Sequence, residues 1–263
     1  MLGVLMANLS LVAQAQTSTA PTTPPALPVP VVPPARPPPP SIPAGATALQ
    51  YRFAQMDRYA SANSQLPPPG EGEKRVIFFG DSITDNWKGK DFFPDKNYID
   101  RGISGQTTTQ LMVRFPYDVA ALHPAVVVIL VGTNDIAQNM GPISFEEITR
   151  NIGLLASMAE TAGIRPIVCS ILPCTEFSWH KGVEPAEKIR TVNQMVQDWC
   201  NAHQVAYVDY YSALVDANHG LPKTLSGDGV HPNSAGYAIM SPLAESAVEK
   251  ALAQGPVTPP PAQ

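Results

Sequence analysis

The sequence predicts a single α/β domain in which helices cover both faces of a parallel sheet. Two observations lead to this fold class. Short apolar runs rich in β-branched residues alternate along the chain with longer helical patterns, and the densest proline clusters lie outside the alternating region. Strands that are buried on both faces of a parallel sheet have such continuous apolar runs.

Five strands and five helices are expected from the pattern. The expected strands are residues 75–80, 97–102, 125–132, 166–172 and 205–208, and the expected helices are residues 49–62, 107–122, 145–162, 185–203 and 234–252. Pro116 should kink or shorten the second helix, whereas Pro185 suits a first helical turn. Five parallel strands with right-handed crossovers predict a flavodoxin-like three-layer α/β/α sandwich.

Prolines separate a globular body from two flanks. Of 29 prolines in 263 residues, twelve lie between Pro21 and Pro43 and four between Pro256 and Pro261. The first of these segments has a single charge, Arg36, and cannot form a core, so we expect an extended spacer. A ligand for a proline-binding domain is the alternative. The expected division is a proline-rich disordered linker at 16–45, a globular α/β domain with an N-terminal helical extension at 46–254 and a proline-rich disordered tail at 255–263.

The first residues fit a signal peptide. Residues 1–15 are largely apolar and end in Ala13-Gln14-Ala15, which matches a small-x-small cleavage site. No Lys or Arg precedes the apolar run. Either the basic region lies upstream of the given start, or the segment is an ordinary apolar terminus. The first interpretation predicts an exported protein, periplasmic or secreted.

Composition argues against two classes of partner. The net charge is −5 and no basic stripe is present, so nucleic-acid binding is not expected. No internal apolar run reaches the ~18 residues that a membrane span requires. The three cysteines, Cys169, Cys174 and Cys200, lack metal-ligand spacing, so no structural zinc is expected. A disulfide between Cys174 and Cys200 is possible, and the sequence does not decide whether it forms.

Ser82 follows the first expected strand, in the sequence Gly80-Asp81-Ser82. Its hydroxyl would lie beyond the carboxyl end of the strand, where open α/β sheets bind ligands. The structural alternative is a helix cap, because Asp and Ser are common N-caps. Thr84 replaces the last glycine of the G-x-S-x-G turn of α/β-hydrolases, so that motif is absent.

Two further loops offer donors for an oxyanion. Gly105, after the second strand, would let its backbone N–H approach a ligand closely. Asn134, after the third strand, would present an amide N–H beside it. Taken alone, Gly105 also fits an ordinary loop before a helix capped by Thr107, and Asn134 and Asp135 fit turn or capping roles.

Asp228 and His231 precede the last helix in the sequence Asp-Gly-Val-His-Pro. A serine hydroxyl needs a base within hydrogen-bond reach to act as a nucleophile, and His231 can be that base. Asp228 can accept the Nδ1–H of the imidazole and so fix its tautomer. Together the four loops meet the residue requirements of acyl transfer, and no metal or other cofactor is expected.

Four segments resemble the sequence blocks of the SGNH hydrolases, also called the GDSL esterase/lipase family. They are FFGDSIT, RGISGQTT, VGTNDI and DGVHPN, in the expected order. The first block has GDSI where the family has GDSL. The resemblance spans about residues 75–252. It implies the SGNH hydrolase fold, Ser82 as nucleophile, His231 as base with Asp228 as its partner, and an oxyanion hole formed by the Ser82 N–H, Gly105 and Asn134.

Supporting and substrate-binding residues are also expected. Asp81 should hold the oxyanion loops by hydrogen bonds, and Asp135 should support Asn134. Possible walls of the substrate pocket are Trp87, Phe177, Trp179 and His180, from the turn after the nucleophile and from the loop after the fourth strand. The aromatic rings could stack on sugar rings or pack against an acyl chain; ordinary loop packing is the alternative.

The expected function is hydrolysis of short acyl esters. No lid or extended apolar segment that would shelter a long acyl chain is evident in the sequence, which favours a small acyl group. The family resemblance implies removal of O-acetyl groups from carbohydrate, so a glycan or a small-molecule ester is the expected substrate. The alternatives are a lysophospholipase or acyl-thioesterase of the same family and, more remotely, a non-catalytic glycan-binding module. The oligomeric state is left open.

Overall fold

The computed structural model describes residues 44–255 and 257. The predicted signal peptide, the predicted linker up to residue 43 and most of the predicted tail lie outside the described residues. The first helix, α1 (Ala44–Phe53), begins inside the range expected for the linker. Within the described residues, no helix combines the length and the apolar character that crossing a membrane would require.

The predicted parallel sheet is confirmed. Its strands are β1 (Val76–Gly80), β2 (Ile99–Gly102), β3 (Val126–Leu130), β4 (Arg165–Cys169) and β5 (Ala206–Val208). All neighbouring strands pair in parallel, in the order β2-β1-β3-β4-β5. Every strand is shorter than the predicted apolar run, because the flanking residues belong to the loops that leave the sheet.

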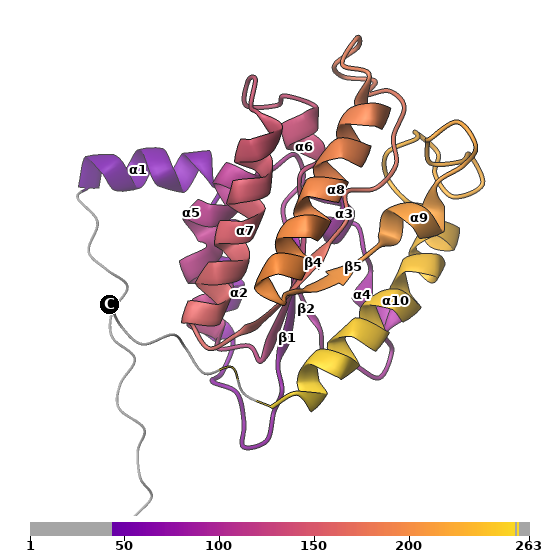
Figure 1. Cartoon of the computed structure of the whole chain (residues 1–263). Helices are drawn as coiled ribbons and strands as arrows, with labels where there is room; N and C mark the ends of the chain where they lie inside the picture. Colours follow the sequence, from indigo (N-terminus) through magenta and orange to yellow (C-terminus); the bar gives the residue numbers. More distant parts are fainter. Residues whose placement is uncertain (1–43, 256, 258–263) are drawn as a thin grey trace, which may run out of the picture. The chain divides into compact units, whose positions relative to one another are not determined.

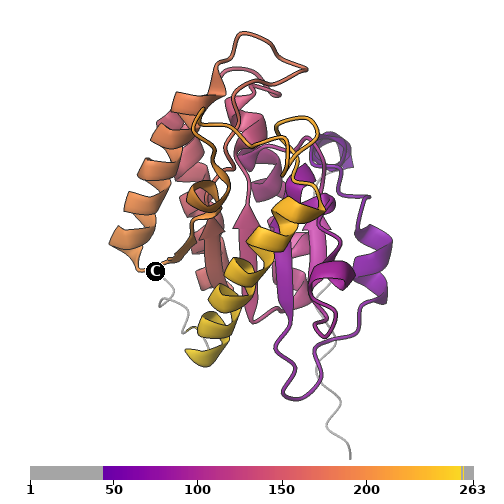
Figure 2. The ribbon, with the colours of Figure 1, turned by 90° about the vertical axis from the view of Figure 1, so that its right-hand side faces the viewer.

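Helices cover both faces of the sheet, as predicted (Figures 1 and 2). One face carries α5 (Thr108–Asp118), α7 (Phe145–Thr161) and α8 (Pro185–His203), and the other carries α4 (Gly89–Phe92), α9 (Tyr210–Leu214) and α10 (Ser234–Ala253). Successive residues of β1 point to opposite faces: Phe79 packs with Phe115 of α5, whereas Phe78 lies in the core beneath α10. Each face therefore has its own apolar core.

The prediction of one continuous helix at 49–62 is wrong. The chain forms α1, then turns, then α2 (Ala60–Gln65). Gln55 has φ of 50°, a left-handed conformation that ends α1. The carbonyl groups of Phe53 and Ala54 are free for other donors at that point, and they accept hydrogen bonds from the side chains of Gln110 and Gln106.

Pro116 shortens its helix, as expected. It lies inside α5, which ends at Asp118, and a separate 3₁₀ turn (Ala120–Leu122) follows. The pattern did not predict four short helices, α3 (Ser82–Asp85), α4, α6 (Thr133–Ile136) and α9, of which α3 and α6 begin directly after β1 and β3. These two carry the polar residues of the strand-end loops.

The three cysteines are free and buried, so the Cys174–Cys200 disulfide that the sequence left open is not formed. Burial raises the pKa of Cys169 and Cys200 to about 12 and that of Cys174 to about 11. All three therefore remain protonated thiols near neutral pH and act as small apolar side chains.

Candidate active site

The turn after β1 brings Ser82 to the carboxyl edge of the sheet. Asp81 caps α3, because its carboxylate accepts the N–H of Ile83 at 3.0 Å. The turn lies against the end of β2: a Cβ atom at Gly102 would lie 2.1 Å from the backbone nitrogen of Asp85. Glycine at position 102 is what allows this close approach.

Ser82, His231 and Asp228 form a continuous series of hydrogen bonds. The Ser82 Oγ lies 2.8 Å from Nε2 of His231, and Nδ1 of His231 lies 2.7 Å from Oδ2 of Asp228. Ser82 and His231 are 149 positions apart in the chain, so the fold alone brings them together. This geometry fits the roles expected from the sequence, with a nucleophile, a base and a group that orients the base.

The loop of Asp228 fixes the charge and orientation of its carboxylate. Oδ1 accepts the N–H groups of Val230 and His231, at 2.9 and 2.8 Å, and the hydroxyl of Ser226 at 3.1 Å. Partial burial alone would raise the pKa of Asp228, but hydrogen bonds from His231 and Val230 bring the pKa well below its ordinary value. The ionised carboxylate favours a proton on Nδ1 of His231, which leaves Nε2 free to accept one from Ser82.

Gly105 lies in the loop between β2 and α5 with φ of 80°. This left-handed conformation strains any residue with a side chain, which explains the glycine. Among the described residues, the Gly105 N–H donates no hydrogen bond to another backbone group. The N–H of Ser82, at the first position of α3, has no acceptor within its helix. Both groups are therefore available as donors.

Asn134, in α6, is 3% exposed and held on both sides of its amide. Its Nδ2 donates to the carbonyl of Gln106 at 3.0 Å and to Oδ2 of Asp81 at 3.3 Å. Its Oδ1 accepts from Nδ2 of Asn139 at 2.8 Å, which fixes which end of the amide faces the loops after β1 and β2. Asn139 was not identified from the sequence; its position five residues after Asn134, just beyond α6, was the available signal.

The two aspartates expected to support the site behave differently. Asp81 contacts Asn134 as expected, whereas Asp135 accepts the backbone N–H and hydroxyl of Thr108, at 2.9 and 2.6 Å, and so joins α6 to the start of α5. The direct support that Asp135 was expected to give Asn134 comes from Asn139. Burial raises the pKa of Asp81 to about 7 and that of Asp135 to about 6.

Two of the four expected pocket residues lie in the core instead. Trp87 is 5% exposed, packs against rings that include Phe78 and Tyr237, and donates its indole N–H to Ser241. Phe177 is fully buried. Their aromatic character reflects packing, so the expectation that they form pocket walls is wrong.

Trp179 and His180 do lie at the surface. Trp179 is 47% exposed, with its ring against Phe177 and its Nε1 donating to Oδ1 of Asn139 at 2.9 Å. Nδ1 of His180 lies 2.6 Å from the carbonyl of Ala137. Trp179 is thus joined through Asn139 to Asn134, although it lies far from it in the chain.

Comparison with known proteins places the chain in a family. Residues 78–239 match the model of the GDSL-like lipase/acylhydrolase family. The chain belongs to this family. The membership predicted from the four sequence blocks is therefore confirmed, and the protein is a carboxylic ester hydrolase.

This acylhydrolase is similar to proteins from several bacteria. A crystal structure of a GDSL-like lipase from Bacteroides thetaiotaomicron VPI-5482 is 41% identical, with a TM-score of 0.73, and the match covers 76% of this chain and 99% of that one. An acetylxylan esterase of Geobacillus stearothermophilus is 28% identical over 65% of this chain and 92% of that protein. Lipoprotein YqeF of Bacillus subtilis (strain 168) is 29% identical over 57% of this chain and 76% of that protein.

Proposed function

We propose that the protein is a serine esterase that removes short acyl groups, above all O-acetyl groups, from carbohydrate. The observation that carries the proposal is the hydrogen-bonded series from Ser82 through His231 to Asp228, at 2.8 and 2.7 Å. A hydroxyl, an imidazole and a carboxylate at these distances can activate the hydroxyl for attack on an ester.

In the first half-reaction, the Ser82 Oγ attacks the ester carbonyl while Nε2 of His231 takes the hydroxyl proton. The carbonyl π electrons move to the oxygen and give a tetrahedral oxyanion. When the C–O bond to the alcohol breaks, His231 returns the proton to the departing alkoxide. Ser82 is left acylated, and the alcohol, in our proposal a sugar hydroxyl, leaves.

The oxyanion would be held by the N–H groups of Ser82 and Gly105 and by the amide of Asn134. The Asn134 amide now donates to the Gln106 carbonyl at 3.0 Å and to Asp81 at 3.3 Å. The longer bond is the weaker one, and we propose that the oxyanion takes this hydrogen in the transition state. Asp81 then acts as a placeholder that keeps the amide oriented before substrate arrives.

In the second half-reaction, water replaces the alcohol. Its proton goes to Nε2 of His231, its oxygen attacks the acyl carbon, and collapse of the second tetrahedral oxyanion returns the proton to the Ser82 Oγ. The products are a carboxylic acid and the free enzyme. Asp228 stabilises the imidazolium that forms in both halves.

Two findings support an acetylated carbohydrate as the substrate. One relative is an acetylxylan esterase, which is 28% identical to this chain. The ring of Trp179 is half-exposed, supported by Phe177 and fixed by Asn139, so it offers a rigid apolar face on which a sugar ring can stack.

We also propose that the enzyme works outside the cytoplasm. A Bacillus subtilis relative is a lipoprotein, and the apolar residues 1–15 fit a signal peptide. Polymeric acetylated glycans occur outside the cell, so this location agrees with the proposed substrate. Cell fractionation of the native host, with detection by antibody, tests the location; detection in the cytoplasm alone would refute it.

The purified protein should be tested on p-nitrophenyl esters from acetyl to palmitoyl, and then on acetylated xylan, pectin and sialate. We expect the highest kcat/KM with acetyl esters and release of acetate from at least one glycan. A maximum at eight carbons or more would point to a lysophospholipase or an acyl-thioesterase instead. Ester hydrolysis on none of these substrates would favour a glycan-binding module.

A further inference from the structure

The chain segment before the family match makes many contacts with the site. We call residues 53–65 the N-terminal clasp; they include the end of α1, the following turns and α2, and they precede residue 78, where the family match begins. All the contacts described below reach the end of β2, the Gly105 loop, α5 or α3.

The first clasp contacts are made by backbone carbonyl groups. Nε2 of Gln106 donates to the carbonyl of Ala54 at 2.7 Å, and Nε2 of Gln110 donates to that of Phe53 at 2.7 Å. Gln106 follows Gly105 directly, is fully buried, and its own carbonyl accepts the Asn134 amide. Gln106 therefore contacts the clasp through its side chain, and it contacts Asn134 through its backbone carbonyl.

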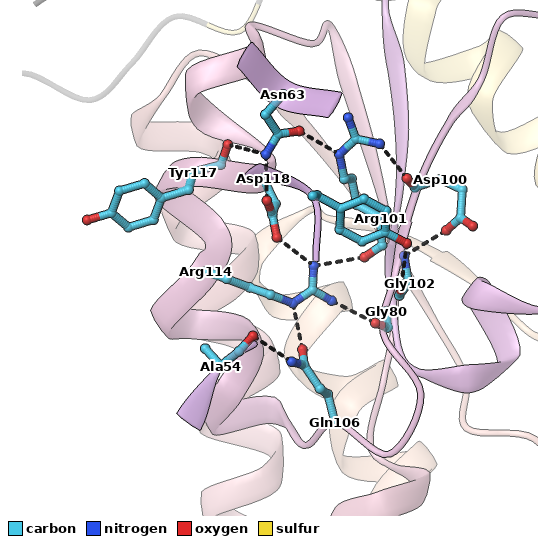
Figure 3. A network of polar contacts seen from close by, with 11 residues as sticks. Ala54, Asn63, Gly80, Asp100, Arg101, Gly102, Gln106, Arg114, Tyr117 and Asp118 are labelled. Carbon is cyan, nitrogen blue, oxygen red and sulfur yellow. Dashed lines mark hydrogen bonds and ion pairs between the residues drawn. The ribbon is translucent and has the colours of Figure 1, made fainter. Parts of the chain in front are cut away.

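Arg114 joins Gln106 to the ends of β1 and β2 (Figure 3). Its fully buried guanidinium donates to the side chain of Gln106 at 2.6 Å, to the carbonyl of Gly80 at 2.8 Å and to that of Arg101 at 2.8 Å. Gly80 leads into the Ser82 turn, and Arg101 leads into the Gly105 loop. Arg114 thus fixes the two loops relative to each other.

The second group of clasp contacts holds the end of β2 (Figure 3). The hydroxyl of Tyr59 donates to the carbonyl of Gly102 at 2.5 Å. Asn63 accepts from Nε of Arg101 at 2.9 Å and donates to Asp118, the ion-pair partner of Arg114, at 2.7 Å. The clasp therefore holds the end of β2 directly, and its Arg58 also contacts Asp85 of α3 at 3.1 Å.

We propose that the N-terminal clasp is a positioning element of the oxyanion hole, a role that rests on the proposed esterase function. Its contacts with Gln106, Gly102 and Arg101 set where the Gly105 N–H lies relative to the Ser82 Oγ. Donors act only if they lie 2.7–3.1 Å from the oxyanion, and a displacement of about 1 Å can lower a rate by about 10²-fold. The clasp touches no reacting atom, so the clasp groups that make these contacts, the carbonyls of Phe53 and Ala54 and the side chains of Tyr59 and Asn63, act through the loop.

The test compares clasp variants with the wild-type protein. Tyr59→Phe removes one hydroxyl and keeps the ring, and Asn63→Ala removes the contacts with Arg101 and Asp118. We expect kcat for p-nitrophenyl acetate to fall about 3- to 10-fold in Tyr59→Phe and about 10-fold or more in Asn63→Ala, with KM changed less than about 2-fold. Ser64→Ala is the matched control, because Ser64 is exposed on α2 and bonds only within the helix.

Two further readouts separate positioning from simple destabilisation. Inactivation by a fluorophosphonate forms an oxyanion-like adduct at serine, so its second-order rate should fall in parallel with kcat. Both rates are measured at least 15 °C below each variant's Tm, where the protein is folded. A kcat that stays at the wild-type value in both clasp variants, or that falls only in proportion to the unfolded fraction, would overturn the proposal.

Failure of the underlying function gives a different result. If the wild-type protein is not labelled by the fluorophosphonate, or is labelled at a residue other than Ser82, the esterase mechanism is wrong and the clasp proposal falls with it. Labelling at Ser82 with unchanged kcat in the clasp variants leaves the mechanism standing and refutes the clasp alone. Mass spectrometry of the labelled peptide distinguishes these outcomes.

Discussion

The two sides of Ser82 are built in opposite ways. On one side, the side chains of Asp228 and His231 are 50% and 31% exposed and lie three positions apart in one loop. On the other side, Asp81 and Gln106 are fully buried and Asn134 is 3% exposed, and the hydrogen bonds of Asn134 to these two residues span 53 and 28 positions. The acid–base side is therefore built from partly exposed residues that are close in sequence. The oxyanion side is built from buried residues that are far apart in the chain, and we call it the dry side.

This difference predicts different links between activity and stability. Exposed polar contacts contribute little to the free energy of folding, because water replaces them when they are lost. Buried hydrogen bonds cannot be replaced by water, so removing one partner leaves the other unsatisfied. Variants on the acid–base side should lose rate alone, and variants on the oxyanion side should lose both rate and stability.

The largest effect is expected where the two sides meet, at Ser82. Ser82→Ala removes the proposed nucleophile and should lower kcat for p-nitrophenyl acetate by about 10⁴-fold or more. Rates from the purified variant and from Ser64→Ala, measured in parallel, check this. Turnover within about 10-fold of the wild-type rate would contradict the assignment of Ser82 and, with it, the division into two sides.

Asp228→Asn tests the acid–base side. The amide would present an N–H to Nδ1 of His231, which favours the tautomer with its proton on Nε2, and this nitrogen could then not accept the Ser82 proton. We expect kcat to fall about 10³-fold while the free energy of unfolding changes by less than about 1 kcal/mol. Enzyme kinetics combined with urea denaturation measures both. A loss of stability larger than this would remove the contrast between the two sides.

Asn134→Ala tests the oxyanion side. It removes one proposed donor to the oxyanion, which should lower kcat about 10²- to 10³-fold with little change in KM. It also leaves the Gln106 carbonyl and the Asn139 amide without their partner, at a loss of about 1–3 kcal/mol of stability. The same two measurements apply. Unchanged urea stability would show that the buried contacts of Asn134 do not support the fold.

Asp81, on the dry side, should also make the free energy of unfolding depend on pH. Burial raises the pKa of Asp81 from 3.8 to about 7, so the folded state binds a proton that the unfolded state has released between these values. The free energy of unfolding should therefore fall as pH rises from about 4 to 7. Burial also raises the pKa of Asp100 and of Asp135 to about 6, so above pH 6 the slope should depend chiefly on Asp81.

Asp81→Asn checks this dependence. The variant cannot release a proton, so its urea stability should change less between pH 6 and 7 than that of the wild-type protein, by up to about 1 kcal/mol. Asp57→Asn, at an exposed position on the clasp, is the matched control and should keep the wild-type slope. Equal slopes in all three proteins would mean that Asp81 does not titrate in this range.

The smallest effect is expected at Trp179, the exposed residue joined to the dry side through Asn139. Trp179→Ala should raise KM for acetylated xylo-oligosaccharides about 3- to 10-fold and leave kcat/KM for p-nitrophenyl acetate nearly unchanged. Trp179→Phe keeps a ring and loses the N–H to Asn139, so it separates stacking from the hydrogen bond. A parallel loss on both substrates in Trp179→Ala would assign the residue to the oxyanion side.

The sequence by itself determined the sheet, the long helices that cover it and the four loops that carry polar residues. A strand that is buried on both faces needs consecutive apolar residues, and such a run can be recognised within a few positions of the sequence. Because parallel strands end at the same edge, the residues after each strand were expected together before any distance was known. Asp228 and His231 were found for the same reason, since their relation is confined to one loop.

Only the tertiary structure decided which residues lie on the dry side and how they are held. Trp87 and Trp179 have the same side chain, yet one packs beneath α10 and the other stays at the surface. Arg114, Asn139 and the clasp contact the site through hydrogen bonds between residues far apart in the chain, or through backbone carbonyls that carry no sequence signal. Such contacts depend on how elements pack in three dimensions, and local pattern does not encode that packing.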